Sequence, residues 1–212
     1  MSLAHALSLL APPLCWSCGA PAPEHDPLCR DCRRSLRWLG SRPFVLDGLI
    51  TWAPIAYEGP ARALVRALKF RGAVGVADAM AAQIAANAQP ALLRDATLVP
   101  MPLHRARARR RGFNQAERIA SALAARRDLE LADCLVREGS RATQVGRDRA
   151  ERITGIEGAI AVRRGAALPR TPIVLVDDVT TTGATLAACA RVLRGRGASV
   201  HAAIAYARTP AR

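Results

Sequence analysis

The chain has 212 residues, with 31 lysines and arginines against 17 aspartates and glutamates, so its formal net charge at pH 7 is +14. Half of the residues are hydrophobic, which excludes disorder of the whole chain and predicts one full domain with a small module attached. No apolar stretch approaches the roughly 20 residues that span a bilayer, and the apolar segment 3–14 lacks the basic lead-in of a secretory signal. We therefore expect a soluble, cytoplasmic protein without membrane insertion.

The basic residues are almost all arginine, 30 of them against a single lysine, Lys69. The planar guanidinium binds phosphates through two parallel hydrogen bonds, which a lysine ammonium cannot do, so this bias suits a phosphate-rich partner. A GC-rich coding sequence would produce the same bias. Only the location of the arginines can separate the two causes.

Four of the six cysteines form two Cys-x-x-Cys pairs separated by ten residues, namely Cys15, Cys18, Cys29 and Cys32. This spacing lets four thiolates converge on one Zn²⁺, as in a zinc ribbon. Two disulfides are the alternative, which a reducing compartment disfavours. Four protein ligands leave no open position, so we expect a structural zinc module over residues 1–42 and a second domain over 43–212. The remaining two cysteines, Cys134 and Cys189, are expected to be core residues.

Strands and helices alternate after the cysteine region. The pattern predicts a strand-like segment over 44–57 with a turn at Asp47-Gly48, strands over 96–100, 159–162, 173–176 and 199–206, and helices over 60–70, 77–88, 115–126 and 184–194. Residues 138–157 are polar and rich in arginine, which indicates a mobile loop. Such alternation predicts an α/β fold with a parallel sheet flanked by helices.

The segment 173–185 combines a buried strand, two carboxylates and a Thr-Gly-rich loop that opens a helix. Asp177 and Asp178 follow four apolar residues, at the end of the strand where open α/β sheets bind ligands. The loop's backbone N–H groups and threonine hydroxyls, with a helix N-terminus behind them, form a nest for a phosphate. A ribose 5-phosphate has both features, hydroxyls for the acids and a phosphate for the loop. The alternative is a solvated turn with two acids that only cap the strand.

This segment resembles the phosphoribosyl-pyrophosphate (PRPP) loop of the type I phosphoribosyltransferases. Three further strings make the whole chain resemble the ComF family, which is associated with competence and DNA uptake and joins a double Cys-x-x-Cys module to such a domain. These strings are Val-Pro-Met-Pro-Leu-His at 99–104, Arg-Gly-Phe-Asn-Gln at 111–115, and Thr143-Gln144 followed by Arg152. The resemblance implies a type I phosphoribosyltransferase fold with an N-terminal zinc-ribbon module.

The resemblance also implies roles for particular residues. Asp177 and Asp178 would bind the ribose hydroxyls, directly or through Mg²⁺. The residues that would hold the 5-phosphate are Val179, Thr180, Thr181, Thr182, Gly183, Ala184 and Thr185. Those of the pyrophosphate loop are Pro100, Met101, Pro102 and Leu103, and the loop arginines that would neutralise the departing pyrophosphate are Arg147, Arg149 and Arg152.

Half of the net charge lies in residues 100–127, which carry eight arginines and one acid, a net +7 (8 − 1). The densest part contains Arg105, Arg107, Arg109, Arg110 and Arg111. Such a block attracts polyanions by counterion release, and both PRPP and single-stranded DNA qualify. Phe113 next to it is expected in the core, with stacking on a base as the alternative.

Two functional hypotheses follow. The first is an enzyme that binds PRPP with Mg²⁺ and transfers its phosphoribosyl group to an acceptor that the sequence does not identify. Hypoxanthine-guanine phosphoribosyltransferases carry an aspartate where this chain has Thr181, which argues against purine salvage of that kind. The second is a non-catalytic nucleotide-sensing or single-stranded-DNA-binding module that works with DNA-uptake machinery.

Overall fold

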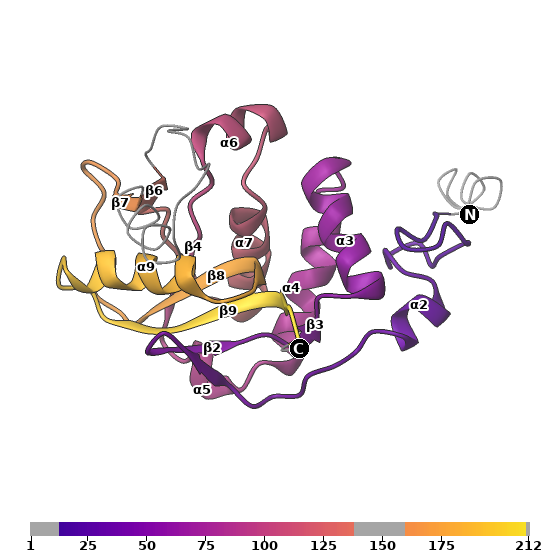
Figure 1. The fold of residues 1–212 in the computed structure, drawn as a ribbon, viewed down its shortest axis with the longest axis horizontal. Helices are drawn as coiled ribbons and strands as arrows, with labels where there is room; N and C mark the ends of the chain where they lie inside the picture. Colours follow the sequence, from indigo (N-terminus) through magenta and orange to yellow (C-terminus); the bar gives the residue numbers. More distant parts are fainter. Residues whose placement is uncertain (1–12, 138–159, 211–212) are drawn as a thin grey trace, which may run out of the picture.

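The computed structural model describes residues 13–137 and 160–210, as an α/β body with a small cysteine-containing module beside it (Figure 1). The helices are α2 (Arg30–Arg34), α3 (Gly59–Phe70), α4 (Val76–Asn87), α5 (Pro90–Leu93), α6 (Arg105–Arg111), α7 (Gln115–Arg127) and α9 (Ala184–Arg194). The strands are β1 (Phe44–Leu46), β2 (Leu49–Trp52), β3 (Ile55–Ala56), β4 (Thr97–Pro100), β5 (Glu130–Leu131), β6 (Leu135–Arg137), β7 (Ile160–Val162), β8 (Ile173–Thr180) and β9 (Val200–Arg208). None of the described helices is long and apolar enough to cross a bilayer.

The main sheet has seven strands in the order β1-β2-β9-β8-β4-β5, with β3 also paired to β9. Strands β1 and β2 form an antiparallel hairpin, whereas the other pairings of this sheet in the described chain are parallel. Strands β6 and β7 form a separate antiparallel pair. The predicted mixed α/β architecture with a mostly parallel sheet is confirmed.

Each face of the sheet carries its own hydrophobic core, because side chains alternate along a strand. In β8, Val174 and Val176 face the core that contains α3, α4 and α7, whereas Ile173 and Leu175 face the core that contains α9. All four residues are fully buried. This explains the uninterrupted apolar run in the sequence, since a central strand covered on both faces has no polar side.

The cysteine module packs against the first of these cores. Leu28 and Leu36 of the module belong to the same buried cluster as Trp52 of β2. The indole Nε1 of Trp52 donates a hydrogen bond to the Gly40 carbonyl at 3.0 Å, and the backbone N–H of Ala56 donates to the Arg37 carbonyl at 2.9 Å. Both side-chain packing and backbone hydrogen bonds therefore join the module to the sheet.

Two elements near the carboxyl edge of the sheet differ from the sequence-based expectation. Strand β8 continues to Thr180, beyond the predicted end at residue 176, because β9 stays beside it and pairs Thr180 with Arg208. The arginine block 105–111 forms helix α6, which the sequence did not predict. This helix contains no buried residue, so its sequence lacks the apolar periodicity of an amphipathic helix. The predicted loop at 138–157 lies outside the described residues.

Candidate functional site

Two of the sequence motifs meet at the carboxyl edge of neighbouring strands. Strands β4 and β8 are parallel and pair Pro100 with Val176. The backbone N–H of Met101 then donates to the Val176 carbonyl at 2.9 Å. The segment 100–103 and the acids at 177 and 178 therefore leave the sheet side by side, as a ligand that spans both motifs requires.

The two acids lie inside β8, so their side chains point to opposite faces of the sheet. Asp178 continues the Val174 and Val176 series and is almost fully buried, with a side-chain exposure of 3%. Its Oδ2 lies 2.5 Å from the Nζ of Lys69, at the end of α3. The face that carries α3 therefore supplies a cation for Asp178.

Asp177 meets a different environment on the α9 side. Asp177 is half-buried, and desolvation together with the neighbouring charge of Asp178 raises its pKa well above the ordinary value, although the charge of Lys69 acts in the opposite direction. Its Oδ1 accepts a hydrogen bond from the backbone N–H of Asp178 at 2.8 Å. A carboxylate in such surroundings is stabilised by any cation that approaches it.

Arg137, the last residue of β6, brings a guanidinium toward Asp177. Burial lowers the pKa of Arg137 and the nearby charge of Arg107 lowers it further, while the charge of Asp177 acts in the opposite direction. An arginine remains charged despite such a shift. Strand β6, helix α6 and strand β8 thus bring charged groups to one region.

The predicted phosphate loop turns sharply into α9 at Gly183. This glycine has φ +76°, a left-handed conformation that L side chains rarely adopt, and a Cβ at this position would lie 2.7 Å from the Cβ and Cδ1 of Leu46. The hydroxyl of Thr182 accepts a hydrogen bond from the N–H of Ala184 at 3.5 Å. Thr180 is buried, and its hydroxyl has no hydrogen-bond partner among the described residues. Leu46 of the hairpin β1-β2 therefore lies against the loop, and only a glycine fits at position 183.

The string Arg-Gly-Phe-Asn-Gln ties the neighbouring loop to α7. Asn114 caps α7, because its side-chain oxygen accepts from the N–H of Ala116 at 3.1 Å, and its Nδ2 donates to the Met101 carbonyl at 2.9 Å. A single side chain thus fixes both the start of a helix and the start of the predicted pyrophosphate loop. Phe113 is half-buried and packs against the core, as expected.

Arg111, the last residue of α6, turns inward from the rest of the helix. Its guanidinium donates a hydrogen bond to the side-chain oxygen of the buried Gln115 and lies over the ring of Phe70, 5.7 Å from the centroid. Burial lowers its pKa, whereas the charge of Asp178 raises it. Phe70 itself is 63% exposed. Arg111 therefore belongs to the surroundings of the acid pair, beside Lys69.

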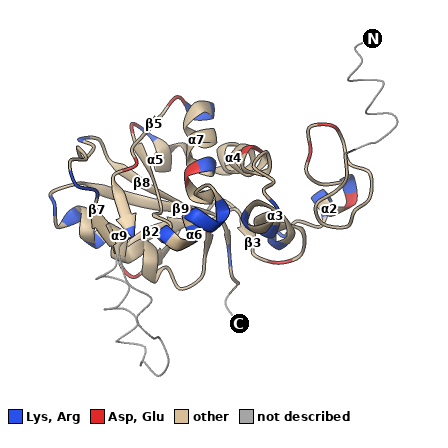
Figure 2. Ribbon diagram, turned by 90° about the horizontal axis from the view of Figure 1, so that it is seen from above, with Lys and Arg blue, Asp and Glu red and all other residues tan. Residues whose placement is uncertain are grey.

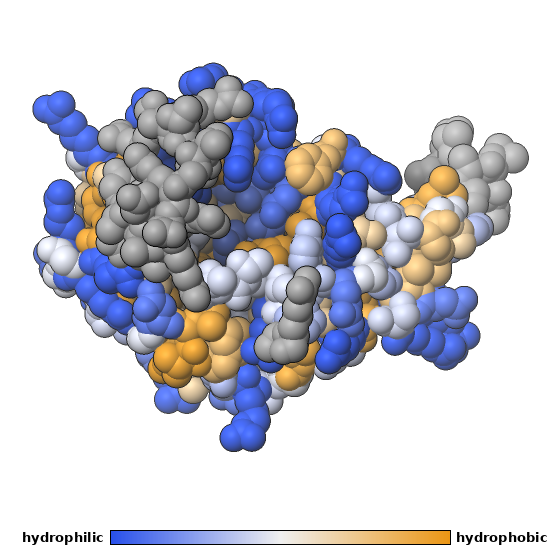
Figure 3. All heavy atoms as spheres, in the orientation of Figure 1, coloured by the Kyte–Doolittle hydropathy of each residue, from blue (hydrophilic) through white to orange (hydrophobic). Residues whose placement is uncertain are grey.

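The other arginines of α6 are exposed, namely Arg105, Arg107, Arg109 and Arg110. Figure 2 shows α6 as an almost continuous basic segment close to α3. On the space-filling surface, hydrophilic residues gather around a recess between α6 and α3 (Figure 3). A dense part of the surplus charge is thus located near the acid pair, which a uniform codon bias does not explain. The loop arginines Arg147, Arg149 and Arg152 lie outside the described residues.

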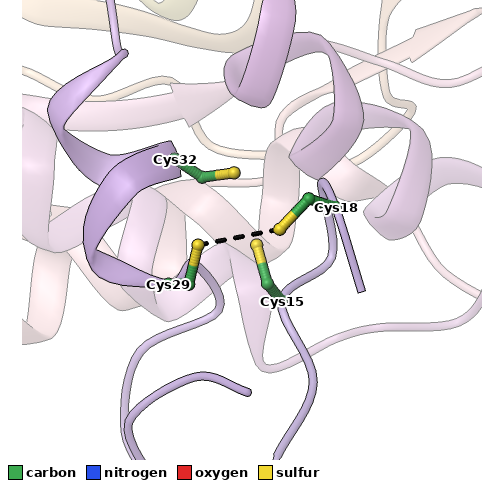
Figure 4. A group of neighbouring side chains, drawn as sticks. All are labelled: Cys15, Cys18, Cys29 and Cys32. Carbon is green, nitrogen blue, oxygen red and sulfur yellow. Dashed lines mark hydrogen bonds between the residues drawn. The ribbon is translucent and has the colours of Figure 1, made fainter. Parts of the chain in front are cut away.

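The four cysteines of the N-terminal module point toward one another (Figure 4). Their Sγ atoms all lie within 4.8 Å of one another, and those of Cys18 and Cys29 are 3.7 Å apart. Zinc–sulfur bonds of about 2.3 Å in a tetrahedron place the sulfurs about 3.8 Å apart. The cluster therefore fits a zinc ion, and no disulfide joins these thiols.

The local environment distinguishes the thiols of this cluster. Burial acts to raise the pKa of Cys15, but hydrogen bonds from the backbone of Cys18, Cys29 and Ser17 outweigh it and lower this pKa to about 6. For Cys32, burial and the adjoining thiols raise the pKa to about 12. Cys15 therefore deprotonates readily, whereas Cys32 would need a nearby cation to do so at neutral pH, and metal binding to thiolates is coupled to such deprotonation.

Cys134 and Cys189 are a different class of thiol. Both are buried, with exposures of 1% and 0%, and burial raises the pKa of each. A thiol in apolar surroundings with a raised pKa is a poor nucleophile. Their expected place in the core is confirmed.

Three cations near the edge were missed by the sequence analysis. Besides Lys69 and Arg137, Arg208 ends β9 opposite Thr180, with its guanidinium 4.2 Å from the centroid of the Phe44 ring. None of the three belongs to a recognisable motif. Lys69 alone carried a signal, because it is the single lysine in a chain with 30 arginines.

No protein-family model matches the chain. Among characterised proteins, the chain is 30% identical over 193 residues to competence protein ComFC of Bacillus subtilis (strain 168), an alignment that covers 88% of this chain and 75% of that protein. It is also 35% identical over 100 residues to ComFC of Streptococcus pneumoniae and 33% identical over 103 residues to competence protein F of Haemophilus influenzae. These two alignments cover 47% of this chain each, and 42% and 44% of the relatives.

Among solved structures, the chain is similar to orotate phosphoribosyltransferase from Aeropyrum pernix, with 21% identity, a TM-score of 0.38, and coverage of 81% of this chain and 75% of that one. The alignment with the Bacillus protein extends over most of this chain and three quarters of its partner. By this relationship, the chain belongs to the ComF family of competence proteins.

Proposed function

We propose that the carboxyl edge of the sheet binds PRPP together with Mg²⁺ and that the protein transfers or senses its phosphoribosyl group. The observation that carries the proposal is the adjacency of β4 and β8, which brings an acid pair, a Thr-Gly loop and a second loop to one edge. Basic side chains from α3, α6 and β6 surround the same edge. A ligand with ribose hydroxyls and phosphates at both ends matches this distribution of groups.

The roles follow the chemistry of each group. Asp177 and Asp178 would bind the ribose hydroxyls or the cation, residues 179–185 the 5-phosphate, and residues 100–103 the pyrophosphate. Carboxylate oxygens suit a hard cation such as Mg²⁺, and the raised pKa of Asp177 indicates that this carboxylate lacks full compensation in the free protein. When bound, Mg²⁺ supplies positive charge for the pyrophosphate. Arg147, Arg149 and Arg152 would add cationic charge from the loop.

Transfer from PRPP develops positive charge on the ribose while negative charge leaves with the pyrophosphate. Positioning and electrostatic stabilisation therefore dominate the catalysis that these residues offer. Asp177 and Asp178 would hold the ribose and face its developing positive charge. The acceptor is not assigned by any described residue, and Thr181 supplies no acid or base to a purine.

The names of the relatives connect this family to competence. We propose that the PRPP site serves DNA uptake in competent cells and that the cysteine module, residues 1–42, stabilises the domain at 43–212 through a structural zinc. Leu28 and Leu36 lie in the same buried cluster as Trp52, which supports a stabilising role for the module.

Calorimetry with PRPP and Mg²⁺ tests the proposal. Asp177→Asn combined with Asp178→Asn preserves side-chain volume and removes both carboxylates, so we expect binding to weaken by at least about 100-fold, a loss that corresponds to roughly 2.7 kcal/mol. The matched control is Asp78→Asn with Asp133→Asn, which removes two exposed carboxylates elsewhere. Equal PRPP binding by the double variant and the parent would overturn the proposed site.

A second candidate function is the binding of single-stranded DNA by α6, supported by the four exposed arginines of that helix. Replacing Arg107, Arg109 and Arg110 by alanine leaves the inward-facing Arg111 in place. The logarithmic salt dependence of oligo(dT) binding should then become shallower by about 0.7 per lost phosphate contact. The control replaces exposed arginines elsewhere, Arg62, Arg164 and Arg196. Equal losses in both variants would show that net charge alone is responsible and would exclude α6 as the site.

A further inference from the structure

The single lysine of the chain makes the most buried ion pair at the sheet edge. Its Nζ lies 2.5 Å from Oδ2 of Asp178, and the two side chains are 23% and 3% exposed. The other cationic side chains of the chain are 30 arginines. The one side-chain ammonium group of the chain is therefore located at the acid pair.

An ammonium and a guanidinium differ in ways that matter at this position. The ammonium is a compact charge on a flexible four-carbon stem, whereas the planar guanidinium grips a carboxylate with two parallel hydrogen bonds. Lys69 lies in the last turn of α3, which ends at Phe70, and its side chain keeps some contact with solvent. Its Nζ can therefore leave Asp178 by rotation about side-chain bonds, without a movement of the backbone.

Arg111 provides the contrast within the same site. It senses the charge of Asp178, but its guanidinium is engaged by Gln115 and lies over Phe70. Arg111 is thus held by Gln115 and Phe70, whereas Lys69 is held by Asp178. Of these two cations, only Lys69 is suited to be exchanged for a metal ion at Asp178.

The buried carboxylate of Asp178 requires a cation, because an uncompensated charge in such surroundings is costly. Lys69 satisfies this requirement in the free protein. A divalent cation that approached the same oxygen would meet the ammonium at a distance where two positive charges repel strongly. The two cations therefore compete for Asp178.

We propose that Lys69 is a displaceable counter-ion that makes metal binding at the acid pair depend on a phosphorylated ligand. Without the ligand, Lys69 occupies Asp178 and keeps the affinity for a divalent cation low. When a phosphorylated ligand binds with the metal, the metal takes the carboxylate and the ligand's phosphates receive the released ammonium. The ligand part of this inference rests on the proposed PRPP site, whereas the competition between Lys69 and a metal does not.

Binding of Mn²⁺ alone, followed by electron paramagnetic resonance of the full chain, tests the competition. In Lys69→Met the ammonium is absent, so Mn²⁺ should bind at least about tenfold more tightly than in the parent, a gain of about 1.4 kcal/mol. The matched control is Arg66→Met, which removes one positive charge from the exposed face of the same helix. This control should change the affinity for Mn²⁺ by less than about twofold, because an exposed charge is screened.

Three further variants establish that the gained affinity arises from the lost ammonium and is located at Asp178. Lys69→Arg restores a positive charge and should return Mn²⁺ binding to the weak level of the parent. Lys69→Met with Asp178→Asn should lose the gained affinity, which excludes binding at the cysteines. Lys69→Gln keeps a polar side chain and replaces the methionine variant if that one does not fold.

The final measurement concerns the coupling to the ligand. Ribose 5-phosphate should increase the affinity of the parent for Mn²⁺, because its phosphate receives the ammonium that competes with the metal. The effect on Lys69→Met should be much smaller, since this variant has no ammonium to displace. Equal Mn²⁺ affinities of Lys69→Met and Arg66→Met would overturn the inference. Failure of the parent to bind PRPP would instead overturn the proposed function and leave the Mn²⁺ result interpretable.

Discussion

The cysteine module and the carboxyl edge of the sheet are both built from groups that bind cations or anions, yet they are assembled in opposite ways. The four thiols come from a stretch of 18 residues, 15–32, and lie within 4.8 Å of one another. The acid pair draws its partners from α3, α6 and β6, up to about a hundred residues away in the chain. The first site is local and closed, and the second is assembled by the fold and remains open.

This difference indicates different functions. Four thiolates can saturate a tetrahedral ion, which would leave no position for a substrate and would make the module a source of stability, as we propose. The sheet edge instead holds a carboxylate with a raised pKa, a buried threonine hydroxyl without a partner among the described residues, and a lysine paired with a buried aspartate. Groups that are incompletely satisfied inside the fold are the ones available to a ligand.

The largest effect is expected at the closed site. Cys29→Ser removes a buried ligand, so bound zinc should fall from about one equivalent to near zero, and the free energy of unfolding should drop by at least about 4 kcal/mol, since structural zinc contributes directly to folding. Metal analysis and urea denaturation measure both. If the protein without metal had the same free energy of unfolding, the cysteine module would not be a zinc-dependent source of stability.

Thiol labelling provides the control for that experiment. After chelation the module should lose the metal that holds it together, so iodoacetamide should reach its four cysteines, whereas Cys134 and Cys189 lie in the core of the sheet, with exposures of 1% and 0%, and should react only in denaturant. Mass spectrometry of the labelled peptides distinguishes the two groups. Equal labelling rates would show that the cysteines do not form two classes.

At the open site, the loop next to α9 should be the most sensitive backbone position. Gly183→Ala introduces a Cβ against Leu46 at a left-handed φ, so the free energy of unfolding should fall by about 3 kcal/mol. Gly75→Ala is the matched control, because Gly75 has φ −60° and open space around its Cα, and alanine there should be neutral or stabilising by up to about 1 kcal/mol. Equal effects in urea denaturation would contradict the tight support of the loop by the hairpin.

A smaller effect is expected at Asn114, which joins two elements of the site. Asn114→Ala removes the cap of α7 and the hydrogen bond to Met101, so unfolding should become easier by about 1.5 kcal/mol. Asn114→Asp keeps the capping oxygen but loses the donor to the Met101 carbonyl. It should therefore retain part of the stability and still disturb the segment 100–103. If the aspartate and alanine variants lose equal stability, the cap contributes nothing.

The smallest effect is expected for an ion pair outside both sites. Asp78 and Arg126 form an exposed pair at 2.5 Å, with side-chain exposures of 62% and 35%. A double-mutant cycle should give a coupling of about 0.5 kcal/mol that disappears in about 1 M salt. The buried pair of Lys69 and Asp178 should show a larger and more salt-resistant coupling. A larger coupling energy for Asp78 and Arg126 than for Lys69 and Asp178 would contradict the stronger ion pairing expected at the sheet edge.

Much of this protein was determined by the sequence itself, wherever the information is local. The spacing of four cysteines predicted their cluster, and the apolar run at 173–176 predicted a strand covered on both faces. Most predicted helices and strands lie within two residues of their observed positions. Hydrophobic periodicity and ligand spacing act over a few residues, which is why they can be recognised without a fold.

The composition of the open site was decided only by tertiary structure. Asp177 and Asp178 are adjacent in sequence, yet the pleat of β8 sends them to different faces, because β9 continues beside them and keeps the chain extended. Lys69, Arg137 and Arg208 reach the edge from elements that are remote in the chain. The sequence around each of these residues does not predict which carboxylate or loop it will contact. Long-range packing alone decides which charges surround each acid.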